Sequence, residues 1–352
     1  MAYMPLNQIV DALDELDAQQ KQILLGILQD AITPSTTKAE TTLSNMEEIR
    51  GARFHDGLIC PHCKMHCKFK KNGTYRGRQR YLCKSCDRTF NDFTSTPLHG
   101  TKYPEKWAAY LQAMEQGFSL RKCAQEVGIT LPTSFEWRHK ILHALSVIKN
   151  QSLEGIVESD ETYVLYSEKG KHNLPRKARK RGGVAKKRGI SNEQVCVLVA
   201  RDRTKHTLSQ VVTFGRLDAA TLDQVLTSSL KPGVILCTDE EPTFRKYCRE
   251  QKLQHEKVNP GKKRYVTKEI YHIQNVNAYH QRFKSFLHPF QGVASKYLNH
   301  YVAYHHFMDD TTNLTAMSRT KELFLRAMMQ PMKTTGSRLS AYCDEQIIKM
   351  TG

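Results

Sequence analysis

The chain has 352 residues, 39% hydrophobic and 25% charged, which is the composition of a folded protein of two or three domains. Lys and Arg number 53 against 35 Asp and Glu, and the net charge of +18 favours a polyanionic partner such as nucleic acid. No run of about 18 apolar residues and no signal-peptide pattern is found, so we expect no membrane partner and an intracellular protein whose ten Cys do not form disulfides.

The N-terminal segment, residues 1–50, is expected to contain helices and a linker. Residues 5–32 carry apolar side chains at helical spacing, which predicts one or two amphipathic helices. Residues 33–50 are polar and rich in Ser and Thr, which is typical of a linker. We assign no chemistry to either part.

Residues 51–100 contain two CxxC pairs separated by 19 residues. A tight turn of this kind points two thiolates at one ion, and two such turns complete a tetrahedral zinc site. Four thiolates leave no open position, so we expect a structural zinc ribbon. His66 and Cys67 lie close by and are competing ligands. The predicted zinc ligands are Cys60, Cys63, Cys83 and Cys86.

The segment between the two pairs, residues 68–82, is strongly basic with Tyr interleaved. This pattern predicts a two-stranded ribbon that lies on a phosphate backbone, with a solvated basic hairpin as the alternative for any single residue. The predicted DNA contacts here are Lys70, Lys71, Arg76, Arg78 and Arg80.

Residues 101–150 resemble a helix-turn-helix. A helical pattern at 104–116 is followed by Ser119, a suitable N-cap, and by Gly128, where the turn between two helices needs positive φ. A third helix over 132–145 would be the recognition helix. The basic residues predicted to contact DNA from it are Arg138 and Lys140.

Residues 151–310 have the texture of an α/β domain, and residues 311–352 form a weakly patterned C-terminal tail without assigned function. A helix is expected at 218–230 and a long helical stretch at 275–307. The predicted strands, rich in Val and Ile, are residues 155–165, 194–202, 208–215 and 233–239.

Two acidic positions stand out in this domain. Asp160 lies inside an apolar strand, where a carboxylate is costly unless it is paired or binds a metal. Asp239 lies at the C-terminal end of another strand, where α/β proteins place ligand sites. Two such carboxylates can hold Mg²⁺ or Mn²⁺ for phosphoryl transfer. The alternative is that both are ordinary strand-end acids.

A loop at 169–188 contains ten Lys or Arg residues. Such a run is usually a solvated loop, but next to a metal-dependent nuclease site we expect it to clamp phosphate and to give steep salt dependence. The predicted DNA contacts in it are Arg176, Lys177, Arg179, Lys180 and Arg181.

The order of these features carries a family resemblance. A zinc ribbon, a helix-turn-helix, the motif VESDETY, the motif ILCTDEEPTF and the block NVNAYHQRFK…GVASKYL together resemble bacterial insertion-sequence transposases with an RNase H-like core. More narrowly, they are similar to the subgroup whose third acid is replaced by Asn and followed by Lys seven residues later. The resemblance covers about residues 55–308, and its last block is the most specific part.

The resemblance implies a catalytic set of Asp160, Asp239, Asn277 and Lys284, in which the two Asp bind the catalytic metal. Residues seven apart share a helix face, so Asn277 and Lys284 can point into one site. The Asn can offer a carbonyl oxygen, and the Lys can anchor a phosphate as a point charge. Glu269, the nearest upstream acid, remains the alternative third ligand.

We therefore expect a multidomain protein with a zinc ribbon, a helix-turn-helix domain and an α/β, RNase H-like catalytic core. The resemblance implies a DNA transposase that binds terminal inverted repeats, nicks DNA and transfers strands, as a homodimer or higher multimer at the bacterial nucleoid. The rivals are a non-enzymatic DNA-binding regulator, which makes no use of the acids, and a structure-specific nuclease, which cleaves DNA but never joins it.

Overall fold

The computed structural model describes residues 21, 50–51, 53–54, 57–66, 68–148, 151–171, 173–174, 177, 183–259, 265–330, 332 and 336–351. The predicted N-terminal helices and linker therefore lie almost wholly outside the described residues. The chain divides into two compact units. Unit 1 comprises Met1–Arg138 and Asp309–Lys333, and unit 2 comprises His139–Met308 and Thr334–Gly352.

The N-terminal part of unit 1 is a small antiparallel sheet. Its strands are β1 (Phe69–Tyr75), β2 (Arg78–Cys83) and β3 (Thr89–Phe90). The two residues between β1 and β2, Arg76 and Gly77, both have positive φ, which is the geometry of a tight hairpin turn. The predicted two-stranded ribbon is thus confirmed as a hairpin, and β3 adds a third strand to it.

The helical part of unit 1 follows the predicted pattern. Ser119 accepts a hydrogen bond from the Lys122 backbone N–H, and Gly128 ends the next helix with φ of 65°. Both roles were predicted from the sequence. The helices are η1 (Pro104–Lys106), α4 (Trp107–Glu115), α5 (Leu120–Val127), the first half of α6 (Leu131–Ser146) and α11 (Ala316–Met329).

Helix α11 belongs to unit 1, although the sequence pattern predicted only a weakly patterned tail for residues 311–352. It packs against α4, and Arg319 of α11 forms a half-buried ion pair with Glu115 of α4 at 2.8 Å. The second C-terminal helix, α12 (Gly336–Thr351), belongs to unit 2. The C-terminal residues are therefore parts of two folded units.

Unit 2 is built on a five-stranded sheet with the order β6-β5-β4-β7-β8. The pairs β4–β5 and β5–β6 are antiparallel, whereas β4–β7 and β7–β8 are parallel. All four predicted strands are present, and β8 is an addition. The strands are β4 (Ile156–Leu165), β5 (Gln194–Asp202), β6 (Thr207–Phe214), β7 (Ile235–Asp239) and β8 (Gln254–Val258).

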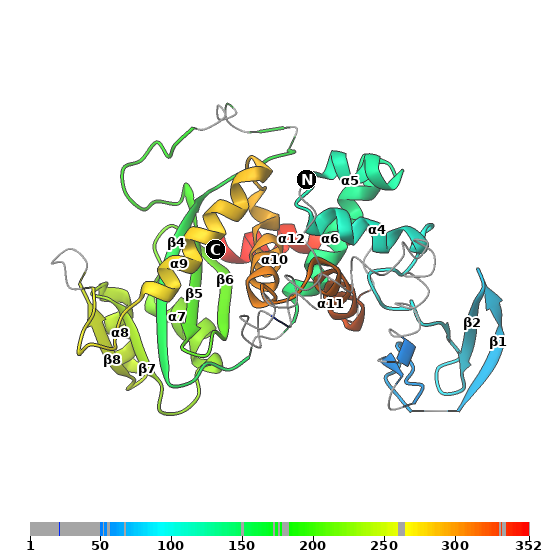
Figure 1. Cartoon of the computed structure of the whole chain (residues 1–352), viewed down its shortest axis with the longest axis horizontal. Coiled ribbons are helices and arrows are strands. Elements are labelled where there is room, and N and C mark those ends of the chain that lie inside the picture. Colours follow the sequence, from blue (N-terminus) through cyan, green and yellow to red (C-terminus); the bar gives the residue numbers. More distant parts are fainter. Residues whose placement is uncertain are drawn as a thin grey trace, which may run out of the picture. The chain divides into compact units, whose positions relative to one another are not determined.

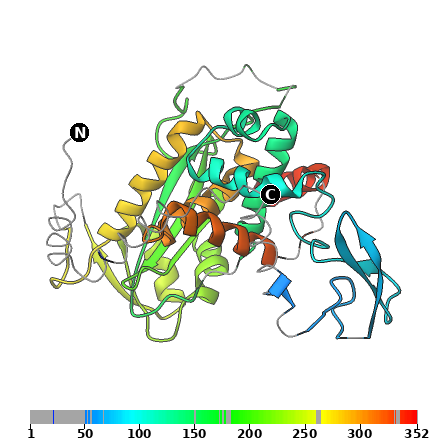
Figure 2. The same ribbon diagram turned by 45° about the vertical axis from the view of Figure 1, so that its right-hand side comes forward.

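Helices cover both faces of this sheet (Figures 1 and 2). Strand β5 is buried on both sides and is accordingly apolar throughout its middle, as a central strand in such a layer must be. One face packs on α7 (Ala219–Leu226) and α8 (Pro242–Glu250), and the other on α9 (Gln274–Leu287) and α10 (Leu298–Asp310). Unit 2 is thus a mixed α/β domain, as predicted.

Within the described residues, no helix combines the length and the apolar character that crossing a membrane requires. The nine cysteines of this part of the chain are all free.

Candidate functional site

The four predicted zinc ligands come together in unit 1. Their sulfur atoms all lie within 4.8 Å of one another, with 3.7 Å between Cys60 and Cys86 and 3.7 Å between Cys63 and Cys83. A disulfide needs about 2.05 Å. Four thiolates held about 2.3 Å from one zinc ion lie roughly 3.8 Å apart, which is the spacing found. The group therefore fits a tetrahedral zinc ion.

Two matching turns hold these cysteines. The Lys64 N–H donates to the Cys60 carbonyl at 2.9 Å, and the Asp87 N–H donates to the Cys83 carbonyl at 3.0 Å. Lys64 and Asp87 each follow the second Cys of a pair, and both have positive φ. The competing ligand His66 is exposed and is not in the group, and Cys67 lies outside the described residues.

The basic residues of the ribbon differ in their exposure. Lys70, Lys71 and Arg76 are exposed and available to a phosphate backbone. Arg78 instead forms a two-pronged ion pair with Asp92 and lies 3.6 Å above the ring of Phe93. The Arg80 guanidinium donates to the Thr89 hydroxyl at 2.9 Å. The predicted DNA contacts at Arg78 and Arg80 therefore have structural roles inside the ribbon.

The expectation that Arg138 and Lys140 contact DNA conflicts with their burial, since their exposed fractions are 3% and 5%. The Arg138 guanidinium donates to the Phe118 carbonyl at 2.7 Å and to the Cys123 sulfur at 3.1 Å. It therefore stabilises the packing of α5 and α6. Sequence spacing placed these cations on a recognition helix but could not show which face of α6 is buried.

The basic loop between β4 and β5 is described only in part. Lys177 is exposed. Lys169 donates through Nζ to the carbonyls that follow α9, at Phe290, Gln291 and Gly292. The remaining predicted contacts, Arg176, Arg179, Lys180 and Arg181, lie outside the described residues.

The two predicted metal-binding acids lie next to each other in unit 2. Strands β4 and β7 are parallel neighbours, paired from Ile156 with Ile235 to Glu158 with Cys237. The same register continued by two residues sets Asp160 beside Asp239. Residues at one level of adjacent strands point to the same face, so the sheet brings together two carboxylates that are 79 positions apart.

Burial and neighbouring carboxylates disfavour the charged forms of both acids. Burial, followed by the neighbouring Asp239 carboxylate, raises the pKa of Asp160 to about 7. Burial also raises the pKa of Asp239. Glu161 joins them, because burial and the charges of Asp160, Asp239 and Glu241 raise its pKa to about 8. Clustered, partly desolvated carboxylates of this kind are what a bound cation stabilises.

Helix α9 lies against this acidic group. His280 is 8% exposed, and its Nδ1 lies 3.6 Å from Oδ2 of Asp160. The charge of Lys284 acts to lower the pKa of Asp160 and so lies near it. Asn277 is exposed and falls on the same helix face, three residues before His280 and seven before Lys284. Glu269 lies in an exposed turn ahead of α9, with φ of 64°.

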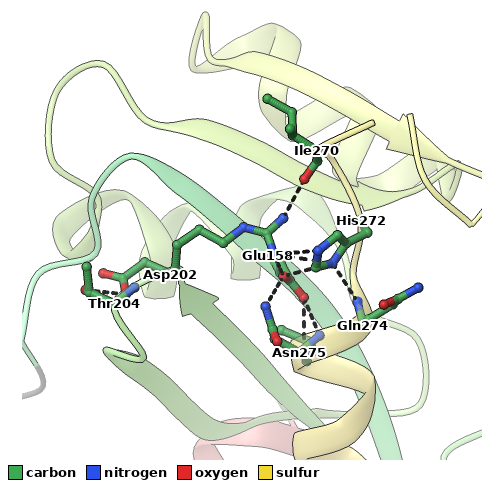
Figure 3. Close-up of polar contacts among 9 residues, drawn as sticks. Glu158, Asp202, Thr204, Ile270, His272, Gln274 and Asn275 are labelled. Atoms are coloured by element: carbon green, nitrogen blue, oxygen red, sulfur yellow. Dashed lines mark hydrogen bonds and ion pairs between the residues drawn. The ribbon is translucent and has the colours of Figure 1, made fainter. Parts of the chain in front are cut away.

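Figure 3 shows how α9 is attached to the strand that carries Asp160. The Glu158 side chain is fully buried and accepts hydrogen bonds from the backbone N–H groups of Asn275 and Val276, at 2.8 and 3.1 Å. N–H groups in the first turn of a helix have no carbonyl partner within the helix, and a carboxylate is favoured there. Arg203 donates to the same carboxylate at 2.6 Å, and His272 lies 3.3 Å from it.

Sequence reasoning missed the contacts that Glu158 and His280 make. Glu158 was visible as a charged residue inside an apolar strand, which is the signal that singled out Asp160. His280 gave no such signal, because a lone His on a helix is usually a core or surface residue. Its contact with Asp160 spans 120 positions of the chain.

Two comparisons relate this chain to proteins of transposable elements. Residues 152–310 match the family model described as an ISXO2-like transposase domain. A curated relative from Halobacterium salinarum, described as an uncharacterized protein in transposable element ISH50, is 27% identical over 289 residues, which is 80% of this chain and 91% of that protein.

Solved structures give a weaker likeness. The Mos1 strand transfer complex has a TM-score of 0.23 and 12% identity, and covers 70% of this chain and 78% of its own. The Mos1 mariner paired end complex with Mn has a TM-score of 0.23 and 10% identity, and covers 99% of this chain and 98% of its own. Superpositions this poor carry no argument about fold or mechanism.

Proposed function

The ISXO2-like domain and the ISH50 relative support an insertion-sequence transposase, and from this premise we propose that the chain cuts and joins DNA with a divalent cation held by Asp160 and Asp239. The observation that carries the proposal is the parallel register of β4 and β7, which sets Asp160 beside Asp239 when it is continued by two residues. The raised pKa of Asp160, caused by burial and then by the Asp239 carboxylate, supports it, because a bound cation would stabilise the charged carboxylate.

The donor set fits such a cation. Carboxylate oxygens are the preferred ligands of Mg²⁺ and Mn²⁺. When bound, these ions activate a water or a 3′-hydroxyl and stabilise the leaving oxygen of an in-line displacement. In this proposal Lys284 would contact a DNA phosphate, and Asn277 would offer an amide oxygen at the third position. The strand order, three antiparallel strands beside two parallel ones, supports an RNase H-like core in which β4 is the first strand.

We assign DNA binding to the remaining basic surface. The exposed cations of the ribbon, Lys70, Lys71 and Arg76, and the loop at 169–188 would hold phosphates. Helices α4, α5 and α6 have the order and the Gly turn of a helix-turn-helix, and we propose that they bind the terminal inverted repeats. A homodimer or higher multimer would bridge the two element ends.

The proposal is tested with purified protein, Mg²⁺ or Mn²⁺, and labelled DNA carrying the repeats that flank the gene. We expect the wild-type protein to nick the repeat end and to join its 3′ end to target DNA, and we expect Asp160→Ala and Asp239→Ala to do neither while still binding DNA. Binding without cleavage by all three proteins would indicate a DNA-binding regulator. Cleavage of branched DNA without joining would indicate a structure-specific nuclease.

A further inference from the structure

We propose that His280 is a further donor to the divalent cation held by Asp160, so that an imidazole nitrogen takes part where other sites of this chemistry use a third carboxylate. The proposal rests on the proposed function, because it adds a ligand to the same site. It differs from the sequence prediction, which gave the third position to Asn277 or Glu269.

The position of the imidazole is the first argument. His280 is buried, with Nδ1 3.6 Å from Oδ2 of Asp160. This separation is too long for a hydrogen bond. Its other nitrogen, Nε2, is buried and lacks a hydrogen-bond partner within the described part of the chain. A buried polar ring that faces a carboxylate without bonding to it leaves room for a bridging group.

The separation also fits a shared cation. Two donors on adjacent corners of an octahedral ion, each about 2.1 Å from it, lie roughly 3 Å apart. The observed 3.6 Å needs only a small rotation of either side chain to reach that value. Imidazole binds divalent transition metals more readily than it binds the harder Mg²⁺ ion. The site is therefore expected to prefer Mn²⁺ to Mg²⁺ more strongly than a site made only of carboxylates.

The attachment of α9 is the second argument. Glu158 binds the first turn of this helix (Figure 3). Asp160 is two residues further along β4, so its side chain points to the same face of the sheet as that of Glu158. The ring of His280 is thus held above Asp160 by a buried network on the same strand. Asn277 lies nearly one turn earlier on α9 and is exposed. His280 lies 3.6 Å from a predicted metal ligand, Asp160.

The test measures metal binding rather than DNA cleavage. Untagged, full-length, zinc-loaded protein is titrated with Mn²⁺, and binding is followed by electron paramagnetic resonance. Electron spin echo envelope modulation then reports whether a nitrogen nucleus is bonded to the Mn²⁺. The variants are His280→Gln, Asp160→Asn and, as a matched control on an exposed position of the same helix, Gln281→Ala.

We expect the wild type and Gln281→Ala to bind Mn²⁺ with nitrogen coupling. His280→Gln should lose that coupling and bind Mn²⁺ at least roughly tenfold more weakly, the loss seen even for residues that only orient a ligand. Zinc content and circular dichroism should not change. Retention of nitrogen coupling and affinity in His280→Gln would overturn the proposal.

Two results separate this inference from the proposed function. If Asp160→Asn abolishes Mn²⁺ binding but His280→Gln does not alter it, the metal site stands and only the His280 ligand is wrong. If Asp160→Asn leaves Mn²⁺ binding intact, the metal site itself is wrong. Should His280→Gln fail to fold, the wild-type spectrum still decides, because Mn²⁺ bound without nitrogen coupling contradicts the proposal.

Discussion

The carboxylate of Glu158 binds the backbone N–H of Asn275 at 2.8 Å and its side-chain amide at 2.6 Å, and so joins β4 to the first turn of α9. Asp160 follows two residues later on the same strand. One strand therefore carries both a proposed metal ligand and the attachment point of the helix that brings His280 and Lys284 to it. The relative positions of these groups depend on a single buried carboxylate.

We predict that Glu158→Gln lowers the rate of DNA cleavage by roughly 10²-fold, because an ångström-scale displacement of α9 misplaces its side chains over Asp160. The amide also removes the counter-charge of the partly exposed Arg203 guanidinium, so the free energy of unfolding should fall by about 2 kcal/mol. Cleavage kinetics and urea unfolding measure the two effects.

Glu250→Gln is the matched control, since it makes the same substitution at a half-exposed site whose 3.9 Å ion pair with Lys246 is weak. It should change the free energy of unfolding by less than about 0.5 kcal/mol and leave cleavage unaltered. DNA affinity should be the same for both variants. A Glu158→Gln protein that cleaves at the wild-type rate would show that the attachment of α9 does not position the site.

The acidic group predicts an unusual pH dependence of stability for the metal-free protein. Asp160 and Glu161 have pKa values raised to about 7 and about 8 in the folded state, against about 4 in the unfolded state. Between about pH 4 and pH 8 the folded state therefore binds more protons, so stability falls as pH rises through this window. Thermal melting of unit 2 from pH 4 to pH 8 measures this fall.

Asp160→Asn removes one of the titrating groups, so its melting temperature should exceed that of the wild type by a few degrees at pH 8, and the difference should vanish near pH 4. Added Mn²⁺ should raise the wild-type melting temperature more at pH 8 than at pH 5, since protons compete with the cation. A wild-type protein whose stability rises steadily from pH 4 to pH 8 would contradict the raised pKa values.

Features that depend on residues close together in the sequence were the ones best predicted. The zinc ligands, the N-cap at Ser119 and the turn at Gly128 depend on spacings of a few residues, and all were predicted. Strands rich in Val and Ile were predicted as well. Strand β8 was missed, because QHEKV is mostly polar and becomes a strand only by pairing with β7 at the sheet edge.

Other contacts between distant parts of the chain were not predictable. The roles of Glu158 and His280 depend on how α9 crosses the sheet, which no local pattern encodes. The same limit applies to the predicted DNA contact at Arg138, which is basic in the sequence but is buried and bonded to the Phe118 carbonyl. A cation that stabilises the fold and a cation that binds DNA look alike until burial is known.

Removal of zinc should affect only unit 1. Cys83→Ser breaks the four-thiolate group, so we expect loss of the bound zinc, unfolding of the ribbon and weaker DNA binding. Mn²⁺ binding in unit 2 should stay at the wild-type level. Metal analysis and circular dichroism measure these effects. The control, Cys248→Ala, removes a buried cysteine of unit 2 and should keep one zinc per chain, whereas loss of zinc from it would argue against a self-contained ribbon site.

The basic residues of the ribbon are of two kinds: some are exposed, and others are bonded within the ribbon. Lys70→Ala combined with Lys71→Ala removes two exposed charges, so DNA affinity should fall. The slope of log K against log salt should decrease by about 1 for each phosphate that is no longer neutralised. The melting temperature should not change. Arg78→Ala removes the ion pair with Asp92 and the stacking on Phe93 and should destabilise the ribbon. Fluorescence anisotropy at several salt concentrations measures both variants. An unchanged salt slope in the double lysine variant would remove the ribbon from the DNA-binding surface, because two charges that neutralise phosphates cannot be deleted without releasing fewer counterions.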